Sequence, residues 1–327
     1  MTRVTVIGAG VVGAAAAWAL TGRGAEVTVH EQFELGHGRG SSHGRTRIVR
    51  LAYPDPEWVR LAADAREDWR RLEEESGRTL LSLVGLVELA ASPGLTSQAG
   101  LAACGVEHRL LTPAEALLLG VALPAGWCAL YEPGGGFVRA DLACTALLDA
   151  ARGRGARILA GSRVESLGEL DADVIVVAAG AWVRDLVPDV PVRITRETLA
   201  YFRREGPPLP SVGQLSEDGS GHLLYALHDP VYGVKAGAHH GGGEADPHEP
   251  GLPDEQIVER VAAWVRERLP GVDPNPVAAE TCLYTTTPGE TFVLERRGRL
   301  VVASACSGHG FKFAPLVGER VAELVLG

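Results

Sequence analysis

The N-terminal 31 residues constrain the fold more than any other stretch of the chain. An apolar segment, Val4 to Ile7, leads into glycines spaced as GxGxxG, and an alanine-rich segment then continues to about Arg23. A second apolar segment, Glu26 to His30, ends at the acid Glu31. This order predicts a strand, a tight turn, a helix and a second, parallel strand. Such a unit needs a parallel sheet whose two faces are both covered.

The glycines and the acid of this unit have separate roles in binding a dinucleotide. Gly8 permits the tight turn, Gly10 lets the backbone approach a pyrophosphate, and Gly13 lets the helix pack closely on the strand. The helix N-terminus offers free N–H groups to the phosphates. Glu31 is placed to accept hydrogen bonds from a ribose diol. The motif alone does not separate FAD from NAD, because both cofactors carry the same ADP half.

Later segments complete this domain. Residues 171 to 180, DADVIVVAAG, form an apolar run that predicts another parallel strand buried on both faces. A helical pattern over Ala140 to Arg152 and a strand-like stretch over Ala156 to Val164 come before it, and Asp55 to Gly77 is a further amphipathic helix candidate. We therefore expect an α/β protein with a discontinuous Rossmann-like cofactor domain, formed by residues 1–80, 136–190 and 281–327.

The remaining residues, 81–135 and 191–280, have the pattern of a second domain. Short β-branched and aromatic runs predict strands over Val84 to Leu89, Trp127 to Tyr131, Thr198 to Phe202, Leu223 to Leu227 and Val231 to Ala236. Thr112 to Glu115 is a capping box, and Asp254 to Leu269 is an amphipathic helix candidate. We expect a substrate domain built on a largely antiparallel sheet.

Composition excludes several classes of protein. The net charge of −10 argues against nucleic-acid binding. The apolar start lacks the basic flank and cleavage site of a signal peptide, and no apolar run is long enough to span a membrane. Five scattered cysteines without a CxxC favour a reduced, cytoplasmic protein. The segment from His239 to His248 has metal-ligand residue types but no standard spacing, so we interpret it as a solvated loop and expect no metal.

Lysine is nearly absent from the chain. Of 31 basic residues, only Lys235 and Lys312 are lysines. Lysine is a compact ammonium whose pKa falls readily on burial, whereas arginine is a planar and permanent cation. A site that needs a compact or titratable cation does not accept arginine. Both lysines are therefore candidate functional residues.

Three strings of residues go beyond these general patterns. They are SHGRTRIVR from Ser42 to Arg50, YGVKAGAH from Tyr232 to His239, and the C-terminal pair CLYT at Cys282 and SGHGFKF at Ser307. Together with the GxGxxG start, they resemble the monomeric sarcosine oxidase family within the D-amino-acid-oxidase-like FAD-dependent oxidoreductases. The resemblance extends from the glycine motif to the C-terminal helix, with the strings in the family's order.

The resemblance implies a cofactor and a set of site residues. The cofactor is FAD, bonded covalently through the sulfur of Cys282. It implies that Lys235 lies over the flavin and assists its reaction with oxygen, and that Arg50 and Lys312 grip the substrate carboxylate. His43 and Arg47 contact the flavin in this family, and the helix after the turn Gly308-His309-Gly310 points at its pyrimidine oxygens. His239 and Tyr225 fall beside the substrate amine. For His309 there is an alternative, since this residue also suits a simple helix cap.

The resemblance predicts oxidation of a secondary or cyclic amino acid to an imine, with O₂ reduced to hydrogen peroxide. Around residues 213 to 216, where the family tends to have bulky residues at the substrate, this chain has Gln214 and Leu215. Three alternatives stay open: a flavin dehydrogenase with a non-oxygen acceptor, a nicotinamide-dependent Rossmann dehydrogenase, and a flavin-binding subunit without turnover. The expected partners are a small amino acid and O₂, and the sequence does not decide the oligomeric state.

Overall fold

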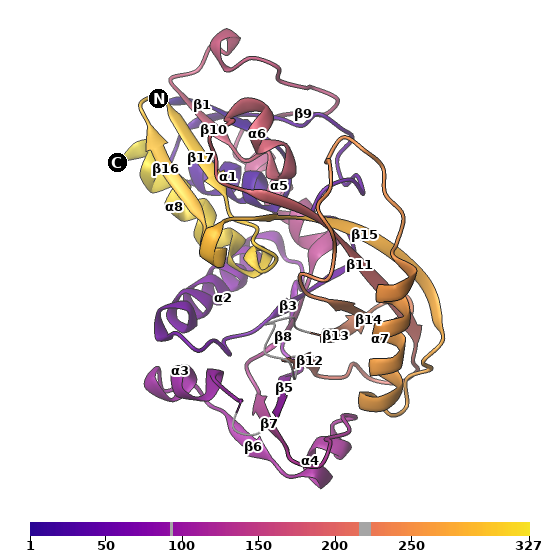
Figure 1. The fold of residues 1–327 in the computed structure, drawn as a ribbon. Helices are drawn as coiled ribbons and strands as arrows, with labels where there is room; N and C mark the ends of the chain where they lie inside the picture. Colours follow the sequence, from indigo (N-terminus) through magenta and orange to yellow (C-terminus); the bar gives the residue numbers. More distant parts are fainter. Residues whose placement is uncertain (92–93, 216–223) are drawn as a thin grey trace.

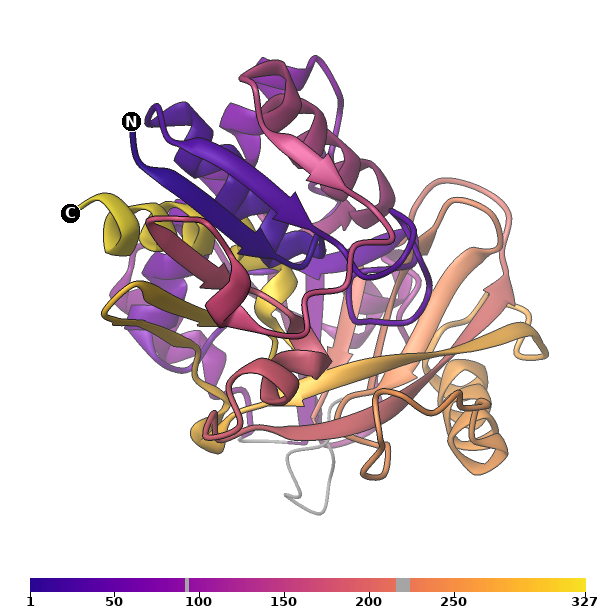
Figure 2. The same ribbon diagram turned by 90° about the horizontal axis from the view of Figure 1, so that it is seen from above.

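The computed structural model describes residues 1–91, 94–215 and 224–327, and its strands form two large sheets and a small one (Figure 1). The six-stranded sheet occupies the upper part of Figure 1, and most of the eight-stranded sheet lies below it. Both termini lie at the same edge of the molecule, beside the six-stranded sheet (Figures 1 and 2). The first residue of the strand predicted over 223–227 lies outside the described residues.

The six-stranded sheet is mainly parallel. Its strands run in the order β16 (Val293–Arg297), β17 (Leu300–Ser304), β10 (Val174–Val177), β1 (Arg3–Ile7), β2 (Glu26–His30) and β9 (Arg157–Leu159). Only the edge pair β16 and β17 is antiparallel. The strand predicted from 156 is short, because Gly161 turns the chain with a φ of +64°. The apolar runs of β1 and β10 are buried, as expected for central parallel strands.

Helices cover this sheet. They are α1 (Val11–Gly22), α2 (Pro56–Ser76), α5 (Ala140–Gly153), α6 (Val183–Leu186) and α8 (Ala314–Leu326). Helix α1 packs between α5 and α8, and its alanines from 14 to 17 are fully buried. A Cβ on Gly318 would lie 2.4 Å from the carbonyl oxygen of Ala15. Small side chains therefore let the N-terminal and C-terminal helices touch closely.

The ends of α2 illustrate how local sequence sets these helices. The side chain of Asp55 accepts a hydrogen bond from the backbone N–H of Glu57, and Pro56 opens the helix. The helix ends at Gly77, whose φ of +65° is the left-handed conformation that glycine adopts without strain. The predicted helix from 55 to 77 is thus confirmed.

The eight-stranded sheet carries the second half of the molecule. Its strands run in the order β15 (Pro276–Thr286), β11 (Arg193–Arg203), β14 (Gly233–Ala238), β13 (Leu224–Asp229), β12 (Ser211–Gln214), β5 (Leu86–Ala91), β7 (Trp127–Glu132) and β6 (Arg109–Leu111). All neighbouring pairs are antiparallel except β5 and β12. Helix α7 (Glu255–Arg268) buries Val261, Trp264 and Val265 in the core of this half.

Shorter elements complete the chain. A small sheet of β3 (Thr46–Val49), β8 (Gly136–Arg139) and β4 (Leu81–Ser82) lies between the two halves. The remaining elements are α3 (Ser97–Ala103), α4 (Pro113–Leu118), and the 3-10 turns η1 (Leu167–Glu169), η2 (Gly180–Trp182), η3 (Pro288–Glu290) and η4 (Gly310–Phe313). Both halves of the capping box predicted at Thr112 and Glu115 are present.

The predicted fold class is confirmed: an α/β protein with a Rossmann-like unit and a largely antiparallel second sheet. The unit is discontinuous, because its strands come from residues 3–30, 157–177 and 293–304. The exact domain boundaries stay a prediction. One of them, at residue 281, falls inside β15, which belongs to the eight-stranded sheet along its whole length.

Candidate active site

A cavity of about 690 Å³ extends from the glycine-rich turn after β1 to the strands of the second sheet. All of the predicted site residues except Gly13 line it: Gly8, Gly10, Glu31, His43, Arg47, Arg50, Tyr225, Lys235, His239, Cys282, Gly308, His309, Gly310 and Lys312. These residues come from distant parts of the chain, and the meeting of the two sheets brings them together.

The glycine-rich turn forms one end of the cavity. Gly8 has a φ of +102°, and a Cβ there would lie 2.4 Å from the carbonyl oxygen of Ala178. A Cβ on Gly13 would lie 1.9 Å from the carbonyl oxygen of Gly8, so this position lets α1 pack against the turn and does not face the cavity. Gly10 stands at the N-cap of α1 without a side-chain cap. The turn is therefore a cradle of backbone that a pyrophosphate fits.

Glu31 lies beside this cradle, one residue after β2. Its carboxylate accepts hydrogen bonds from the backbone N–H groups of Ala9 (2.8 Å) and Phe33 (3.0 Å), and its Oε1 lies 3.4 Å from His37 Nε2. Burial raises the pKa of Glu31, but these hydrogen-bond donors outweigh it and hold the pKa below its ordinary value. An ionised acid at this place fits a ribose diol, so the residues present suit an ADP-containing cofactor.

Lys235 and Cys282 lie in the middle of the cavity wall, on β14 and β15. Lys235 is 2% exposed, and its Nζ donates a hydrogen bond of 2.6 Å to the carbonyl oxygen of Thr46. Burial, assisted by the charge of Arg47, lowers the pKa of Lys235 to about 7. This ammonium is a compact and titratable cation. The presence of a lysine here, in a chain that uses arginine almost everywhere else, predicts that property.

The environment of Cys282 differs from the sequence-based expectation in one respect. Arg47 and Lys235 are close enough to favour its thiolate, as expected. Burial nevertheless dominates and raises the pKa of the Cys282 thiol to about 12. The nearby cations therefore do not by themselves ionise this sulfur.

His43 lies in the loop that leads into β3, and Arg47 is the second residue of that strand. The Nε2 atom of His43 is buried without a hydrogen-bond partner among the described residues, and burial lowers the pKa of His43 to about 4. Arg47 donates to the backbone carbonyl oxygens of Ser41 (2.7 Å), His43 (2.6 Å) and Thr46 (2.9 Å). His43 thus offers an unpaired polar atom to a ligand in the cavity, whereas Arg47 chiefly holds the loop in shape.

The half-buried Arg50 and the buried Lys312 form a second group of cations, with Tyr53 between them. The Nζ of Lys312 donates to Tyr53 Oη (3.0 Å) and to the carbonyl oxygen of His309 (2.7 Å). The guanidinium carbon of Arg50 lies 4.2 Å from the centre of the Tyr53 ring, and Arg50 also donates to the carbonyl oxygen of Ala52. These hydrogen-bond partners are all neutral, although the carboxylates of Glu88, Glu132 and Glu290 also interact with the charge of Arg50. Burial, assisted by Arg50, lowers the pKa of Lys312 well below its ordinary value, and a bound anion would favour its charged form.

Two residues of this group, Tyr53 and Glu132, belong to none of the strings that predicted the site. In the sequence, Tyr53 is distinguished only by its spacing from Arg50 and its place before the N-cap of α2. Glu132 is a fully buried carboxylate that accepts hydrogen bonds of 3.0 Å from the backbone N–H groups of Leu51 and Ala52 and so fixes the chain next to Arg50. Burial raises the pKa of Glu132 to about 7.

The histidines at this end of the cavity are neutral. His239 Nδ1 lies 3.2 Å from Tyr284 Oη, and burial lowers the pKa of His239 to about 3. His309 makes no capping hydrogen bond at the start of η4; its ring contacts the carbonyl oxygen of Glu290 (3.0 Å) and Tyr53 Oη (3.3 Å). The cap alternative for His309 is therefore not supported. Tyr225 packs with Cys282 and Tyr284 against the same wall.

The SGHGFKF string makes a tight turn at the cavity. Gly308 has a φ of +71°, and a Cβ there would lie 2.4 Å from His239 Cε1. A Cβ on Gly310 would lie 1.7 Å from the carbonyl oxygen of Ala305. The turn continues through η4 into α8, so the N-terminal end of this helical segment is directed toward the cavity lining.

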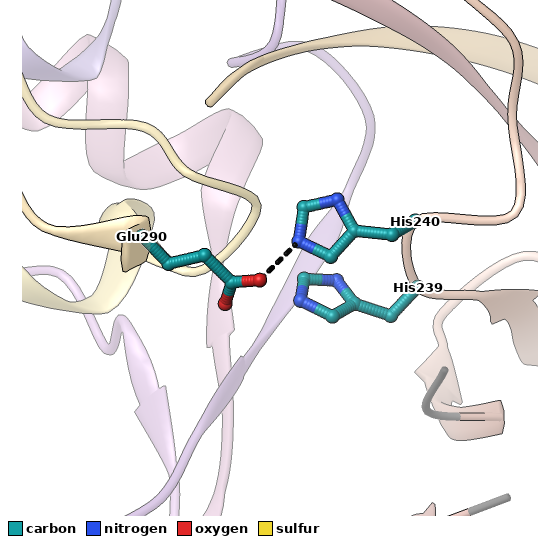
Figure 3. A group of neighbouring side chains, drawn as sticks. All are labelled: His239, His240 and Glu290. Atoms are coloured by element: carbon teal, nitrogen blue, oxygen red, sulfur yellow. Dashed lines mark ion pairs between the residues drawn. The ribbon is translucent and has the colours of Figure 1, made fainter. Parts of the chain in front are cut away.

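Two sequence-based interpretations need correction. Gln214 does not line the cavity; its Oε1 accepts hydrogen bonds from Trp264 Nε1 (2.7 Å) and Arg268 Nε (3.2 Å), which fix it against α7. Ser216 lies outside the described residues. The interpretation of residues 239–248 as a solvated loop is wrong for the first residues of that segment, because the side chain of His240 is only 14% exposed. His240 lies with His239 and Glu290 in a group that could hold a metal ion (Figure 3).

Comparisons with known proteins agree with this geometry. The DAO family model, described as FAD-dependent oxidoreductase, matches residues 3–324. The chain is 33% identical to peroxisomal sarcosine oxidase of Homo sapiens over 98% of its length and 90% of that protein. It is 30% identical to N-methyl-L-tryptophan oxidase of Salmonella heidelberg, over 98% of this chain and 94% of that protein.

A solved structure shows the same architecture. The open form of NikD, an amino acid oxidase essential for nikkomycin biosynthesis, superposes with a TM-score of 0.88. It is 26% identical, and the match covers 100% of this chain and 94% of NikD. Within the described residues, no helix combines the length and apolar character needed to cross a membrane.

Proposed function

The chain belongs to the DAO family of FAD-dependent oxidoreductases, and from this premise we propose that it oxidises a secondary or cyclic amino acid to an imine. The observation that carries the proposal is the pair of the half-buried Arg50 and the buried Lys312, whose described hydrogen bonds all go to neutral oxygens. Two cations at one point favour an anionic ligand, and an amino acid supplies a carboxylate. The family and these relatives establish amine oxidation with FAD only in general.

The cations would bind and orient the substrate. Arg50 and Lys312 hold the carboxylate at one end of the cavity, which fixes the direction of the neighbouring C–H bond. Bound FAD supplies the chemistry by accepting a hydride equivalent from that carbon and passing the electrons on to O₂. The amine must be neutral to lose a hydride, and the buried, neutral surfaces of His239, Tyr225 and Tyr284 disfavour the ammonium form.

Lys235 is our candidate for the reaction with oxygen. It lines the same cavity as the cradle for the pyrophosphate and the carboxylate site, and its ammonium donates a hydrogen bond to the carbonyl oxygen of Thr46. A fixed cation in a dry site stabilises the negative charge that develops as oxygen is reduced. The proposed products are therefore the imine, which water hydrolyses, and hydrogen peroxide.

Attachment of the flavin through Cys282 is a further part of the proposal. Its sulfur is buried in the cavity wall, with Arg47 and Lys235 nearby, and its string CLYT is the one that resembles the covalent flavoproteins. Acid precipitation of the purified protein tests this directly. We expect a yellow pellet from the wild type and a colourless pellet with yellow supernatant from Cys282→Ala. Flavin released from the wild type would show that the linkage is not covalent.

The substrate and the electron acceptor need a second experiment. We expect peroxide formation with one or more members of a panel of N-methyl and cyclic amino acids in air. Fast anaerobic reduction of the flavin with negligible peroxide would favour the alternative, a dehydrogenase with another acceptor. The nicotinamide-dependent alternative is set aside, because the matching family is FAD-dependent. The cytoplasmic location stays a prediction, since relatives of this chain include peroxisomal enzymes.

A further inference from the structure

His239, His240 and Glu290 converge where the turn after β14 meets the 3-10 turn η3 (Figure 3). Each offers one ligand atom, and these atoms lie within 4.8 Å of one another. Figure 3 shows both imidazoles projecting from one segment toward the carboxylate on the other. His239 lines the cavity, whereas His240 and Glu290 have no part in the proposed oxidation.

The contact between His240 and Glu290 has the distance of an ion pair without the geometry of a hydrogen bond. His240 Nε2 lies 3.1 Å from Glu290 Oε1, yet neither buried ring nitrogen of His240 has a hydrogen-bond partner among the described residues. Two ligands of one zinc ion have this arrangement. Tetrahedral bonds of about 2.0 Å place the ligand atoms about 3.3 Å apart, with their lone pairs directed at the metal rather than at each other.

His239 has the second contact that a metal ligand commonly has. Its Nδ1 lies 3.2 Å from Tyr284 Oη, which leaves Nε2 as the ring nitrogen that can face the other two side chains. A metal-binding histidine is commonly held in this way, by a hydrogen bond at its other nitrogen.

The backbone at two of the three residues is strained. His240 has a φ of 54° and Glu290 a φ of 55°, and both values fall in the left-handed region that residues with a Cβ rarely adopt. Strain of this kind persists where surrounding structure holds it, and it often occurs at ligand-binding positions. Here it directs two side chains from separate segments toward one point.

We propose that His239, His240 and Glu290 bind one divalent transition metal ion of the zinc type. Two imidazoles and one carboxylate suit Zn²⁺, whereas Ca²⁺ and Mg²⁺ prefer sites made of oxygen atoms. The ion would join the turn after β14 to η3 and occupy a ring nitrogen at the cavity. Zinc should therefore slow amine oxidation, and this consequence, unlike the binding itself, rests on the proposed function.

Calorimetric titration of the full-length, FAD-loaded protein with zinc chloride tests the site. We expect one zinc ion per chain in the wild type, and affinity at least tenfold lower in His240→Ala and in Glu290→Gln. The matched control is His248→Ala, because His248 lies in the same polar segment but pairs with Asp185, away from the cluster. Its zinc affinity should equal that of the wild type.

Thermal unfolding distinguishes a variant that has lost a zinc ligand from one that is misfolded. Zinc should raise the melting temperature of the wild type and of His248→Ala, but not that of His240→Ala or Glu290→Gln. Equal zinc binding by all four proteins, or none by the wild type, overturns the proposal. Zinc binding at the cluster without any amine turnover contradicts the proposed function alone, whereas turnover without zinc binding contradicts the metal site alone.

Discussion

The two ends of the cavity are built by different means. The end that suits the dinucleotide is made of backbone: Gly8 and Gly10 expose it, and Gly13 lets a helix close on it. The end that suits the amino acid is made of two cationic side chains, Arg50 and Lys312, which donate hydrogen bonds to neutral oxygens. A backbone cradle fails when atoms clash, whereas a charged site fails when charge is lost. The two ends should therefore respond to substitution differently.

The largest effect is expected in the cradle. In Gly13→Ala, the new methyl group would meet the carbonyl oxygen of Gly8 at 1.9 Å, so the helix must shift. We expect a loss of about 3 kcal/mol in the free energy of unfolding, and little bound FAD. Gly153→Ala is the matched control, since nothing lies within 4 Å of its added Cβ. Flavin absorbance and thermal unfolding measure both properties, and full FAD content in Gly13→Ala contradicts the cradle.

The next effect is expected from Lys235→Met, which keeps the volume and removes the charge. Loss of one fixed donor at a developing anion costs about 10²- to 10³-fold in rate. Reoxidation of the flavin by O₂ should slow by that amount in stopped-flow measurements, while anaerobic reduction by substrate changes little. If both half-reactions keep their wild-type rates, Lys235 has no role in the oxygen reaction.

The pH dependence sharpens the same prediction. The pKa of Lys235 is lowered to about 7, so the ammonium form predominates below that pH and is lost as the pH rises through it. Wild-type reoxidation should therefore slow as the pH rises through about 7. The Lys235→Met variant should be slow throughout and lack this step. A wild-type rate that increases over this range would contradict the assignment.

A smaller effect is expected at the carboxylate end. A hydrogen bond to a charged group contributes about 1.5–3 kcal/mol, so Arg50→Ala or Lys312→Met should lower kcat/KM for the amino acid about 10- to 100-fold. FAD content should not change, in contrast to Gly13→Ala. The exposed Arg320→Ala serves as control. If the wild type shows no turnover, and Arg50→Ala and Lys235→Met leave every measurable behaviour unchanged, the protein is a flavin-binding subunit rather than an oxidase.

The smallest effect is expected from Tyr53→Phe. The hydroxyl accepts a hydrogen bond from Lys312, but the ring beneath Arg50 remains. Loss of one such hydrogen bond costs about 1 kcal/mol, which corresponds to a rise of about fivefold in KM with little change in kcat. Tyr131→Phe is the control, because the Tyr131 ring lies beside Arg109 rather than beside Arg50 or Lys312. Unchanged kinetics would show that Tyr53 does not position Lys312.

The same contrast explains what the sequence reveals. The strand, glycine turn and helix at the N-terminus depend on contacts within about thirty residues, so their pattern predicts them. Arg50, Lys235 and Lys312 were identified through strings of residues, but their meeting depends on how the two sheets pack. Tyr53 and Glu132 carry no local pattern of this kind, because only the folded chain places Tyr53 between two cations and Glu132 under the backbone of Leu51.

Two errors have a related cause. Gln214 lies on β12, yet its amide oxygen accepts a hydrogen bond from Trp264 of α7, a partner far along the chain. His240 follows a strand and precedes three glycines, which predicts exposure, but η3 packs against it from another segment. Local composition predicts solvation only where no distant segment returns to cover the residue.

The close contact of α1 with α8 has a consequence for how the protein is made. The helix that bears the glycine motif packs on residues 314–326, and its sheet includes β17 at residues 300–304. Contacts this distant along the chain form late. During synthesis, α1 cannot complete its packing until residues 314–326 have been made. Cofactor capture is therefore expected to follow the synthesis of these residues.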